Sequence, residues 1–95
     1  VAGESTEEGF LGVRGADATG DRAGAAITDV EAGAPAADAG LRPDDVVVGI
    51  DGRRVSSMID LAAAVRTKAP GDTVTLDVVR GGDELTVEVR LGAAP

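Results

Sequence analysis

The stretch EAGAPAADAGLRPDDVVVGIDGRRV, residues 31–55, indicates a short helix followed by a buried strand. Pro35 suits the first turn of a helix and Gly40 suits its C-terminal cap, so the sequence predicts a helix of about one to two turns within residues 33–40. Residues LRPDD then predict a turn. The β-branched run DVVVGIDG predicts a buried strand over 45–52 that ends in a tight Asp-Gly turn.

The clearest helix follows this strand. Ser57 and Asp60 have the S-x-x-D spacing of a capping box. Apolar residues then recur at i, i+3, i+4 and i+7 on one helical face: Met58, Leu61, Ala62 and Val65. Pro70-Gly71 stops the helix. Residues 72–91 alternate apolar and polar side chains around Gly81-Gly82, which predicts a β-hairpin.

The N-terminal part predicts a strand over 9–14, a loop over 15–24 and a second strand over 25–31. The loop is rich in Gly and Asp and has few apolar anchors, so we expect it to be among the most mobile parts of the domain. The order is strand, strand, short helix, strand, longer helix, strand, strand. It predicts an α+β fold, a small, mixed but mostly antiparallel β-barrel or sandwich capped by two helices.

The composition restricts the size and the partners of the protein. A chain of 95 residues forms one domain, which we place at residues 9–92, with linker-like segments at 1–8 and 93–95. The net charge of −8 and the lack of a basic run argue against nucleic-acid partners. No apolar run is long enough for a membrane-spanning helix, so direct membrane insertion is not expected.

Few residues of this sequence suit catalysis. It has no His and no Cys, which excludes Ser-His-Asp and Cys-His arrangements and zinc-thiolate sites. A Ser-Lys dyad would need Lys68, the sole lysine, which lies near solvent at the end of the predicted helix. Asp44 and Asp45, with Asp51 nearby, have the chemistry to bind Ca²⁺ or to act as acid and base. The simpler interpretation is solvated turn residues, and their spacing matches no calcium loop. We expect no cofactor, no metal site and no catalytic residue.

The run GFLGV, residues 9–13, places a glycine at the centre of a predicted strand. Glycine weakens a strand and often marks a close approach of another group, such as a ligand, to the main chain. A strand edge beside an apolar helix forms a groove that accepts an extended peptide as an added strand. A glycine-containing loop at the end of that groove offers consecutive N–H groups to a carboxylate.

GFLGV resembles the carboxylate-binding loop of PDZ domains. Residues 31–55 are similar to the central stretch of that family, and residues 56–92 are similar to its groove helix and closing hairpin. The loop precedes every other element, which resembles the circularly permuted bacterial arrangement. FLGV and the closing VEVRLG look most like the PDZ domain of HtrA-type (Deg) serine proteases. The resemblance covers residues 9–92.

The resemblance implies a module that binds apolar C-terminal or extended peptide segments by strand addition. The peptide would pair with Val13, Arg14 and Gly15. The N–H groups of Leu11, Gly12 and Val13 would receive its carboxylate. The pocket and its floor would come from apolar residues of the loop and the helix: Phe10, Leu11, Val13, Met58, Leu61, Ala62 and Val65. Ala62 leaves room for a moderately large C-terminal side chain.

By the same resemblance, the module serves substrate recognition or regulation of an HtrA-like serine protease in the periplasm or cell envelope, and it catalyses nothing itself. Its partners would be C-terminal or unfolded polypeptide segments and the parent protease domain. Two alternatives remain open. One is the PDZ domain of a site-2-type or other protease, and the other is a non-binding structural or assembly module.

Two positions depart from the family pattern. Glu7 and Glu8 stand just before the loop, where many relatives carry a non-acidic residue, and their charge would weaken the capture of a carboxylate. Asp44 stands where the central turn usually has Gly. This departure suggests a turn of a different type, because Asp accepts a positive φ less readily than Gly.

Overall fold

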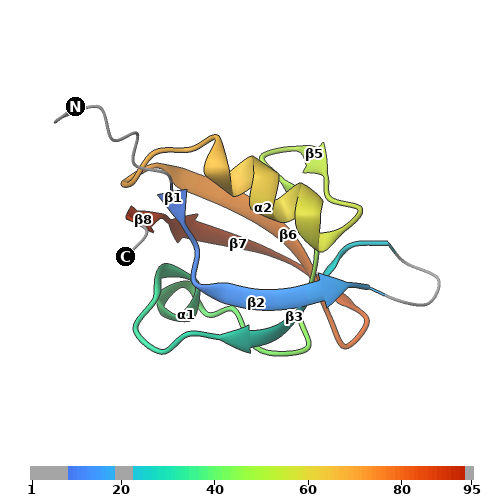
Figure 1. Ribbon diagram of the computed structural model, residues 1–95. Helices are drawn as coiled ribbons and strands as arrows, with labels where there is room; N and C mark the ends of the chain where they lie inside the picture. The colour runs from blue at the N-terminus through green and yellow to red at the C-terminus, as the bar shows by residue number, and fades with distance from the viewer. Residues whose placement is uncertain (1–8, 19–22, 94–95) are drawn as a thin grey trace, which may run out of the picture.

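The computed structural model describes residues 9–18 and 23–93 (Figure 1). The predicted segments at 25–31, 33–40 and 45–52 are present to within two residues at either end. In chain order, the elements of the described residues are β1 (Gly9–Phe10), β2 (Val13–Asp17), β3 (Ala25–Val30), α1 (Pro35–Ala39), β4 (Val46–Ile50), β5 (Arg53–Arg54), α2 (Met58–Arg66), β6 (Thr73–Arg80), β7 (Asp83–Arg90) and β8 (Gly92–Ala93).

Most of the strands form one antiparallel sheet in the order β2-β3-β4-β6-β7, with β5 paired to β4. β1 and β8 form a separate antiparallel pair. Helix α2 packs against β1 to β4, whereas α1 packs against β7, so the helices lie at different sides of the sheet (Figure 1). The α+β class is confirmed. No pairing between the described strands joins β7 to β2, so the sheet is open and the word barrel describes it only loosely.

Both tight turns predicted from the sequence are present. Asp51 and Gly52 connect β4 to β5, and Gly81 and Gly82 connect β6 to β7. All four residues have positive φ, from 50° at Asp51 to 93° at Gly82, which is the conformation of two-residue hairpin turns. The β6–β7 register has no shift along its length, so the hairpin forms as its alternating pattern predicts.

Helix α2 begins as the capping box predicts. Ser57 is its N-cap, and the Ser57 Oγ accepts a hydrogen bond from the N–H of Asp60 over 3.1 Å. The Asp60 carboxylate in turn accepts from the N–H of Ser56 over 3.0 Å. These bonds satisfy N–H groups that have no helical partner. The helix ends at Arg66, ahead of Pro70-Gly71.

The N-terminal segment differs from the sequence expectation. The prediction of a continuous strand over 9–14 is wrong, because β1 ends at Phe10 and the chain bends before β2 begins. The prediction of a loop over 15–24 is wrong for residues 15–17, which belong to β2 and pair with β3. Pairing with β3 supplies hydrogen bonds to the main chain, so a segment without apolar alternation still forms an outer strand. Residues 19–22 lie outside the described residues, and the mobility expected for the loop stays a prediction.

The core is aliphatic, as the near absence of aromatic residues requires. Ala25 and Ala36 are fully buried, and such small side chains let strands and helices approach one another closely. The largest fully buried apolar side chains come from α2 and from the sheet with its adjoining segments: Ile27, Val47, Val55, Leu61, Val74, Leu76, Val78 and Val89.

One charged side chain of the described residues, Asp45, is buried and only 1% exposed. Arg80 donates two hydrogen bonds to it, from Nε to Oδ1 and from Nη2 to Oδ2, each over 2.8 Å. The N–H of Arg42 donates to Oδ2 over 2.9 Å, and Nη2 of Arg80 also donates to the carbonyl of Gly40 over 3.0 Å. The pair therefore joins the turn after α1 to the start of β4 and the end of β6.

These contacts set the ionisation of Asp45. Burial by itself raises the pKa of Asp45, but the hydrogen bonds from Arg80 and from the Arg42 N–H outweigh burial and hold the pKa below its ordinary value of 3.8. A carboxyl group whose pKa is lower in the folded state stabilises the fold above its unfolded-state pKa. That contribution disappears as the pH falls through the folded-state value.

We expect Asp45→Asn to lower the free energy of unfolding at neutral pH by about 3 kcal/mol, because it removes charge-assisted hydrogen bonds in a buried place. Urea unfolding measures the loss. On acidification below about pH 4 the wild type should lose more stability than the variant, so the two curves converge. Asp83→Asn, at an exposed position, is the matched control and should change little. Parallel pH curves for Asp45→Asn and wild type would contradict the ionised role of Asp45.

Asp44 keeps the turn conformation that glycine adopts readily. Its φ is 77°, in the left-handed region, and its N–H donates to the carbonyl of Ile27 over 2.7 Å. The side chain of Asp44 is exposed. The departure from the family pattern is therefore accommodated by local strain at one residue.

Asp44→Gly should raise the free energy of unfolding by roughly 0.5–1 kcal/mol. The left-handed conformation costs a residue with a Cβ about 1–2 kcal/mol, and the greater entropy of Gly in the unfolded chain offsets part of the gain. Asp44→Ala is the matched control, because it removes the carboxylate and keeps the Cβ, and it should bring no gain. Chemical unfolding compares the two variants. Equal effects of Gly and Ala would show that the main chain at this position is not strained.

Candidate functional site

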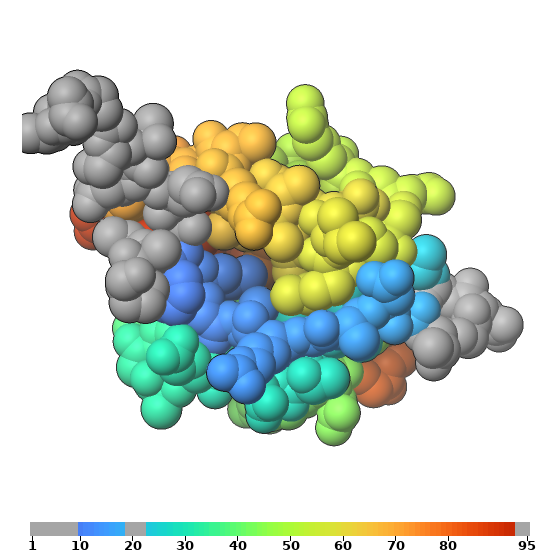
Figure 2. Space-filling model, in the orientation of Figure 1, coloured from blue at the N-terminus to red at the C-terminus, as the bar shows by residue number. Residues whose placement is uncertain are grey.

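β2 is an outer strand of the sheet, and α2 runs beside it. In the strand order β2 has one neighbour, β3. Figure 2 shows β2 and α2 as adjacent ridges on one face of the molecule, and the two elements are in contact. An outer strand has main-chain N–H and C=O groups without a partner in the sheet. The hydrogen bonds of β3 determine which residues of β2 present these groups.

Gly15 presents its N–H and C=O to the free edge. Its partner in the register is Ile27. The N–H of Ile27 donates to the carbonyl of Asp45 over 2.8 Å, and the carbonyl of Ile27 accepts from the N–H of Asp44 over 2.7 Å. Both groups of Ile27 are therefore directed away from β2. Residues directly opposite each other in an antiparallel pair exchange both bonds or neither, so both groups of Gly15 point outward.

Val13 has the same orientation as Gly15. The carbonyl of Gly12 accepts a hydrogen bond from the N–H of Glu31 over 2.9 Å, and these two residues flank the pair Val13↔Val30. A bond in this position accompanies a pair that exchanges no hydrogen bonds of its own. The N–H and C=O of Val13 therefore face the free edge.

Asp17 completes the series at the other end of β2. The N–H of Ala18 donates to the carbonyl of Gly24 over 2.8 Å, and these residues flank the pair Asp17↔Ala25. By the same geometry, the main chain of Asp17 faces outward. Alternate residues of β2, at positions 13, 15 and 17, thus offer N–H and C=O groups to an added strand.

The loop before β2 has its carbonyl groups turned into the protein. The carbonyl of Leu11 accepts from the N–H of Ala36 over 3.0 Å, and that of Gly12 accepts from Glu31. In a trans peptide the N–H points opposite to the preceding carbonyl, so the N–H groups of Gly12 and Val13 point away from these partners. Within the described ranges, the N–H groups of Leu11 and Gly12 donate to no main-chain carbonyl. Consecutive N–H groups in such a bend suit an anion.

Gly12 and Gly15 are both needed because other groups of this chain approach them closely. Gly12 has φ 83°, and a Cβ there would collide with the side chain of Ala34. A Cβ on Gly15 would collide with the carbonyl oxygen of Ala26 and would lie 3.0 Å from the Sδ of Met58. The glycine inside GFLGV is therefore explained by the packing of Ala34, and no ligand is needed to account for it.

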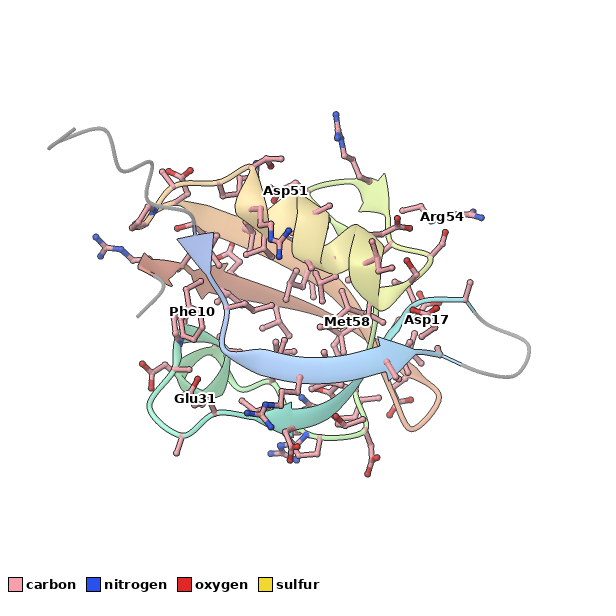
Figure 3. All side chains as sticks on the ribbon, viewed as in Figure 1. Phe10, Asp17, Glu31, Asp51, Arg54 and Met58 are labelled. Carbon is pink, nitrogen blue, oxygen red and sulfur yellow. The ribbon has the colours of Figure 1, made fainter. Side chains whose placement is uncertain are left out.

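Two predicted site residues of α2, Met58 and Ala62, share one face of the helix. Met58 lies beside β2 (Figure 3), and Ala62 follows it by about one helical turn. Both are half-buried. Leu61 and Val65 are 1% and 7% exposed and belong to the core. Burial thus separates the half-buried Met58 and Ala62 from the core positions Leu61 and Val65, a division that the sequence alone does not make.

The other predicted site residues have different surroundings. Leu11 is 5% exposed and belongs to the core. Phe10 lines a hollow of about 440 Å³ together with Glu31 (Figure 3). Arg14 is exposed. Because it alternates with the outward-facing residues of β2, its own main chain is directed toward β3.

Asp17 is a residue of this region that the sequence interpretation missed. Its Oδ1 accepts a hydrogen bond from the N–H of Met58, the first residue of α2, over 2.9 Å (Figure 3). The bond joins the end of the strand to the start of the helix. The two partners are 41 positions apart, so no local pattern indicates the contact.

Lys68 and Asp51, two charged residues considered for catalysis in the sequence, contact other residues of the protein. Lys68 Nζ lies 3.1 Å from Oδ2 of Asp51. The N–H of Thr75, which donates to Asp51 Oδ1 over 2.8 Å, is the main cause that lowers the pKa of Asp51. In the part of the chain that the structure describes, no group of three or more His, Cys, Asp or Glu residues could hold a metal ion. No helix there has the length and apolar character to cross a membrane. Glu7 and Glu8 lie outside the described residues.

Known proteins resemble this chain in sequence. A family model of the PDZ domain matches residues 9–91. A probable periplasmic serine endoprotease DegP-like of Bartonella henselae is 40% identical over 72 residues, which cover 76% of this chain and 14% of that protein. Serine protease PepD of Mycobacterium tuberculosis is 47% identical over 75 residues, covering 78% of this chain and 16% of that protein. The chain thus spans a small part of the length of these relatives.

Solved structures resemble it in fold. The HtrA-type protease AlgW with decapeptide superposes with a TM-score of 0.87 and 28% identity, covering 94% of this chain and 30% of that one. The PDZ domain of HtrA3 bound to a phage-derived ligand has a TM-score of 0.81, covers 93% of this chain and 88% of that one, and at 24% identity is a likeness of fold alone. These matches agree with the resemblance carried by GFLGV and by residues 31–55. The chain belongs to the PDZ domain family, in its HtrA-type (Deg) branch.

Proposed function

We propose that this domain binds extended polypeptide segments, above all apolar C-termini, by adding them as a strand to β2. The observation that carries the proposal is the outward direction of the main chain at Val13, Gly15 and Asp17. Each of these residues has the geometry to exchange two hydrogen bonds with a peptide that runs antiparallel to β2. The set of pairing residues expected from the sequence, 13–15, thereby loses Arg14, whose main chain is directed toward β3, and gains Asp17.

The terminal carboxylate belongs at the loop before β2 in this proposal. A peptide whose last residue lies opposite Val13 brings its carboxylate to the N–H groups of Leu11, Gly12 and Val13. Hydrogen bonds to a charged acceptor are stronger than neutral ones. The similar AlgW structure was solved with a decapeptide, which supports a peptide as the class of ligand.

The side chain of the last peptide residue points toward α2 in the proposed complex. Ala62 on that helix leaves room for an apolar side chain of moderate size, whereas Met58 lies against Gly15 and so faces the third residue from the C-terminus. Buried residues beneath them provide the floor of the pocket: Leu11, Leu61 and Val65. Phe10 and Val13 complete the proposed set at the loop.

The biological setting follows from the relatives. Because several of them are named periplasmic serine endoproteases, we place this domain in the periplasm or cell envelope, as a non-catalytic part of an HtrA-like serine protease. There it recognises substrates or regulates the protease domain. Its partners are C-terminal or unfolded polypeptide segments. Its charge of −8 makes nucleic acid an unfavourable partner.

An apolar-ended peptide with a free C-terminus should bind about tenfold or more tightly than the same peptide with an amidated C-terminus. Hydrogen bonds to a charged group contribute roughly 1.5–3 kcal/mol, and about 1.4 kcal/mol corresponds to tenfold in affinity. Calorimetric titration of the chain with both peptides measures the ratio. If both forms bind equally, the loop does not read a terminus and the groove takes internal segments. If neither binds, the domain is a structural module.

Ala62→Trp should weaken peptide binding by about tenfold or more while the fold survives, because a large side chain at a half-buried position fills the groove. Ala63→Trp is the matched control, since Ala63 is exposed on α2 and lines a hollow beside Arg53 and Arg54. It should leave binding near the wild-type value. Peptide titration and thermal unfolding of both variants decide the matter. Unfolding of Ala62→Trp alone would place Ala62 in the core, where overpacking costs about 1–3 kcal/mol.

A further inference from the structure

Asp17 lies on the face of β2 that is turned toward α2. Its carboxylate accepts a hydrogen bond from the N–H of Met58 in α2. Gly15, two positions earlier, also faces Met58. Side chains alternate between the two faces of a strand, so Arg14 and Ala16, which are exposed, lie on the opposite face.

The proposed strand addition fixes which peptide residue meets Asp17. With the last residue of the peptide opposite Val13, the third residue from the C-terminus lies opposite Gly15 and the fifth lies opposite Asp17. Residues directly opposite each other in a ladder have their side chains on the same face, with Cβ atoms about 4.5–5.5 Å apart. The fifth side chain from the C-terminus therefore emerges beside the carboxylate of Asp17.

The carboxylate of Asp17 has an oxygen available for a ligand. Oδ1 accepts from Met58, and within the described ranges Oδ2 has no hydrogen bond or ion pair. The side chain is exposed at the end of the strand. The nearest described cation along β2, Arg14, belongs to the other face. A long cationic side chain of a peptide has the reach and the three or more N–H donors to bind this oxygen.

We infer that the domain prefers peptides with Lys or Arg at the fifth position from the C-terminus, and that Asp17 is the specificity-determining residue for this preference. The inference rests on the proposed function, because it uses the register of a peptide added to β2. It assigns a side-chain contact at a distance from the terminal pocket, where the main chain alone does not discriminate between sequences.

The test uses a short acetylated alanine peptide as the reference, which ends in leucine and has alanine at the second to fifth positions from the C-terminus. In one derivative Lys replaces the alanine at the fifth position. In its isomer Lys replaces the alanine at the fourth position, opposite Ala16 on the other face. The isomers have the same net charge, so attraction to the acidic chain as a whole cancels. The fifth-position isomer should bind about two- to fivefold more tightly, as expected of an exposed ion pair. The difference should shrink at high salt.

Two variants locate the effect. Asp17→Asn removes the charge and keeps an oxygen that can accept from the N–H of Met58. Asp29→Asn changes the net charge equally at an exposed residue opposite Arg14, on the other face of the sheet. The ratio of the two isomers should fall to about one in Asp17→Asn and stay at the wild-type value in Asp29→Asn. Binding of the alanine peptide, measured with each variant, reports whether the groove is intact.

Each outcome has one meaning. If the wild type binds the alanine peptide but does not distinguish the two lysine isomers, the inference is wrong and the proposed function stands. If Asp17→Asn retains the wild-type ratio, the preference does not come from Asp17. If the wild type binds none of the peptides, strand addition itself fails, and the inference fails with it. Should Asp17→Asn not fold, the isomer ratio of the wild type at low and high salt still decides the preference.

Discussion

The buried carboxylate of Asp45 and its partly exposed partner Arg80 hold the segment whose main chain bonds to Ile27, and Ile27 determines which main-chain groups of the outer strand β2 stay free. Arg80 holds the Asp45 carboxylate at the start of β4, which places the main chain of Asp44 and Asp45 against Ile27. Ile27 has then used both of its main-chain groups, and Gly15 directs its own away from β3. A shift of one residue would turn these groups inward and exchange the two faces of β2. The edge to which we propose that a peptide adds therefore depends on the ion pair of Asp45 with Arg80.

Much of the fold can be predicted from local chemistry. Asp51-Gly52 and Gly81-Gly82 determine their turns because both residues of each pair accept positive φ. The Ser57 capping box and the apolar stripe after it determine α2. By contrast, the break at Leu11 and Gly12 and the strand at 15–17 arise from partners distant in sequence. The N–H groups of Ala36 and Glu31 donate to the carbonyl groups of Leu11 and Gly12. The residues next to the loop in the sequence do not indicate these contacts.

In the candidate site, too, some residues can be identified from the sequence and others depend on tertiary packing. The sequence identifies the loop and the stripe on α2, but it cannot tell groove positions from core positions, because Met58 and Ala62 share their helical face with Leu61 and Val65. Tertiary packing makes that distinction. The glycines are a second example, since Gly12 and Gly15 are explained by Ala34, Ala26 and Met58. The sequence does not identify Asp17, because the residues around it have the composition of a loop and because it contacts a helix that begins 41 positions later.

Main-chain and side-chain contacts have different consequences in the proposed complex. Hydrogen bonds from Val13, Gly15 and Asp17 recognise any extended peptide, and the loop recognises any free C-terminus, so these contacts give affinity and direction without selecting a sequence. Selection has to come from side chains on the α2 face of β2. At Asp17 the two kinds of contact meet, because its main chain faces the peptide while its carboxylate binds the first N–H of α2. Pairing of a peptide at this position is thus tied to the placement of the helix that forms the opposite wall of the groove.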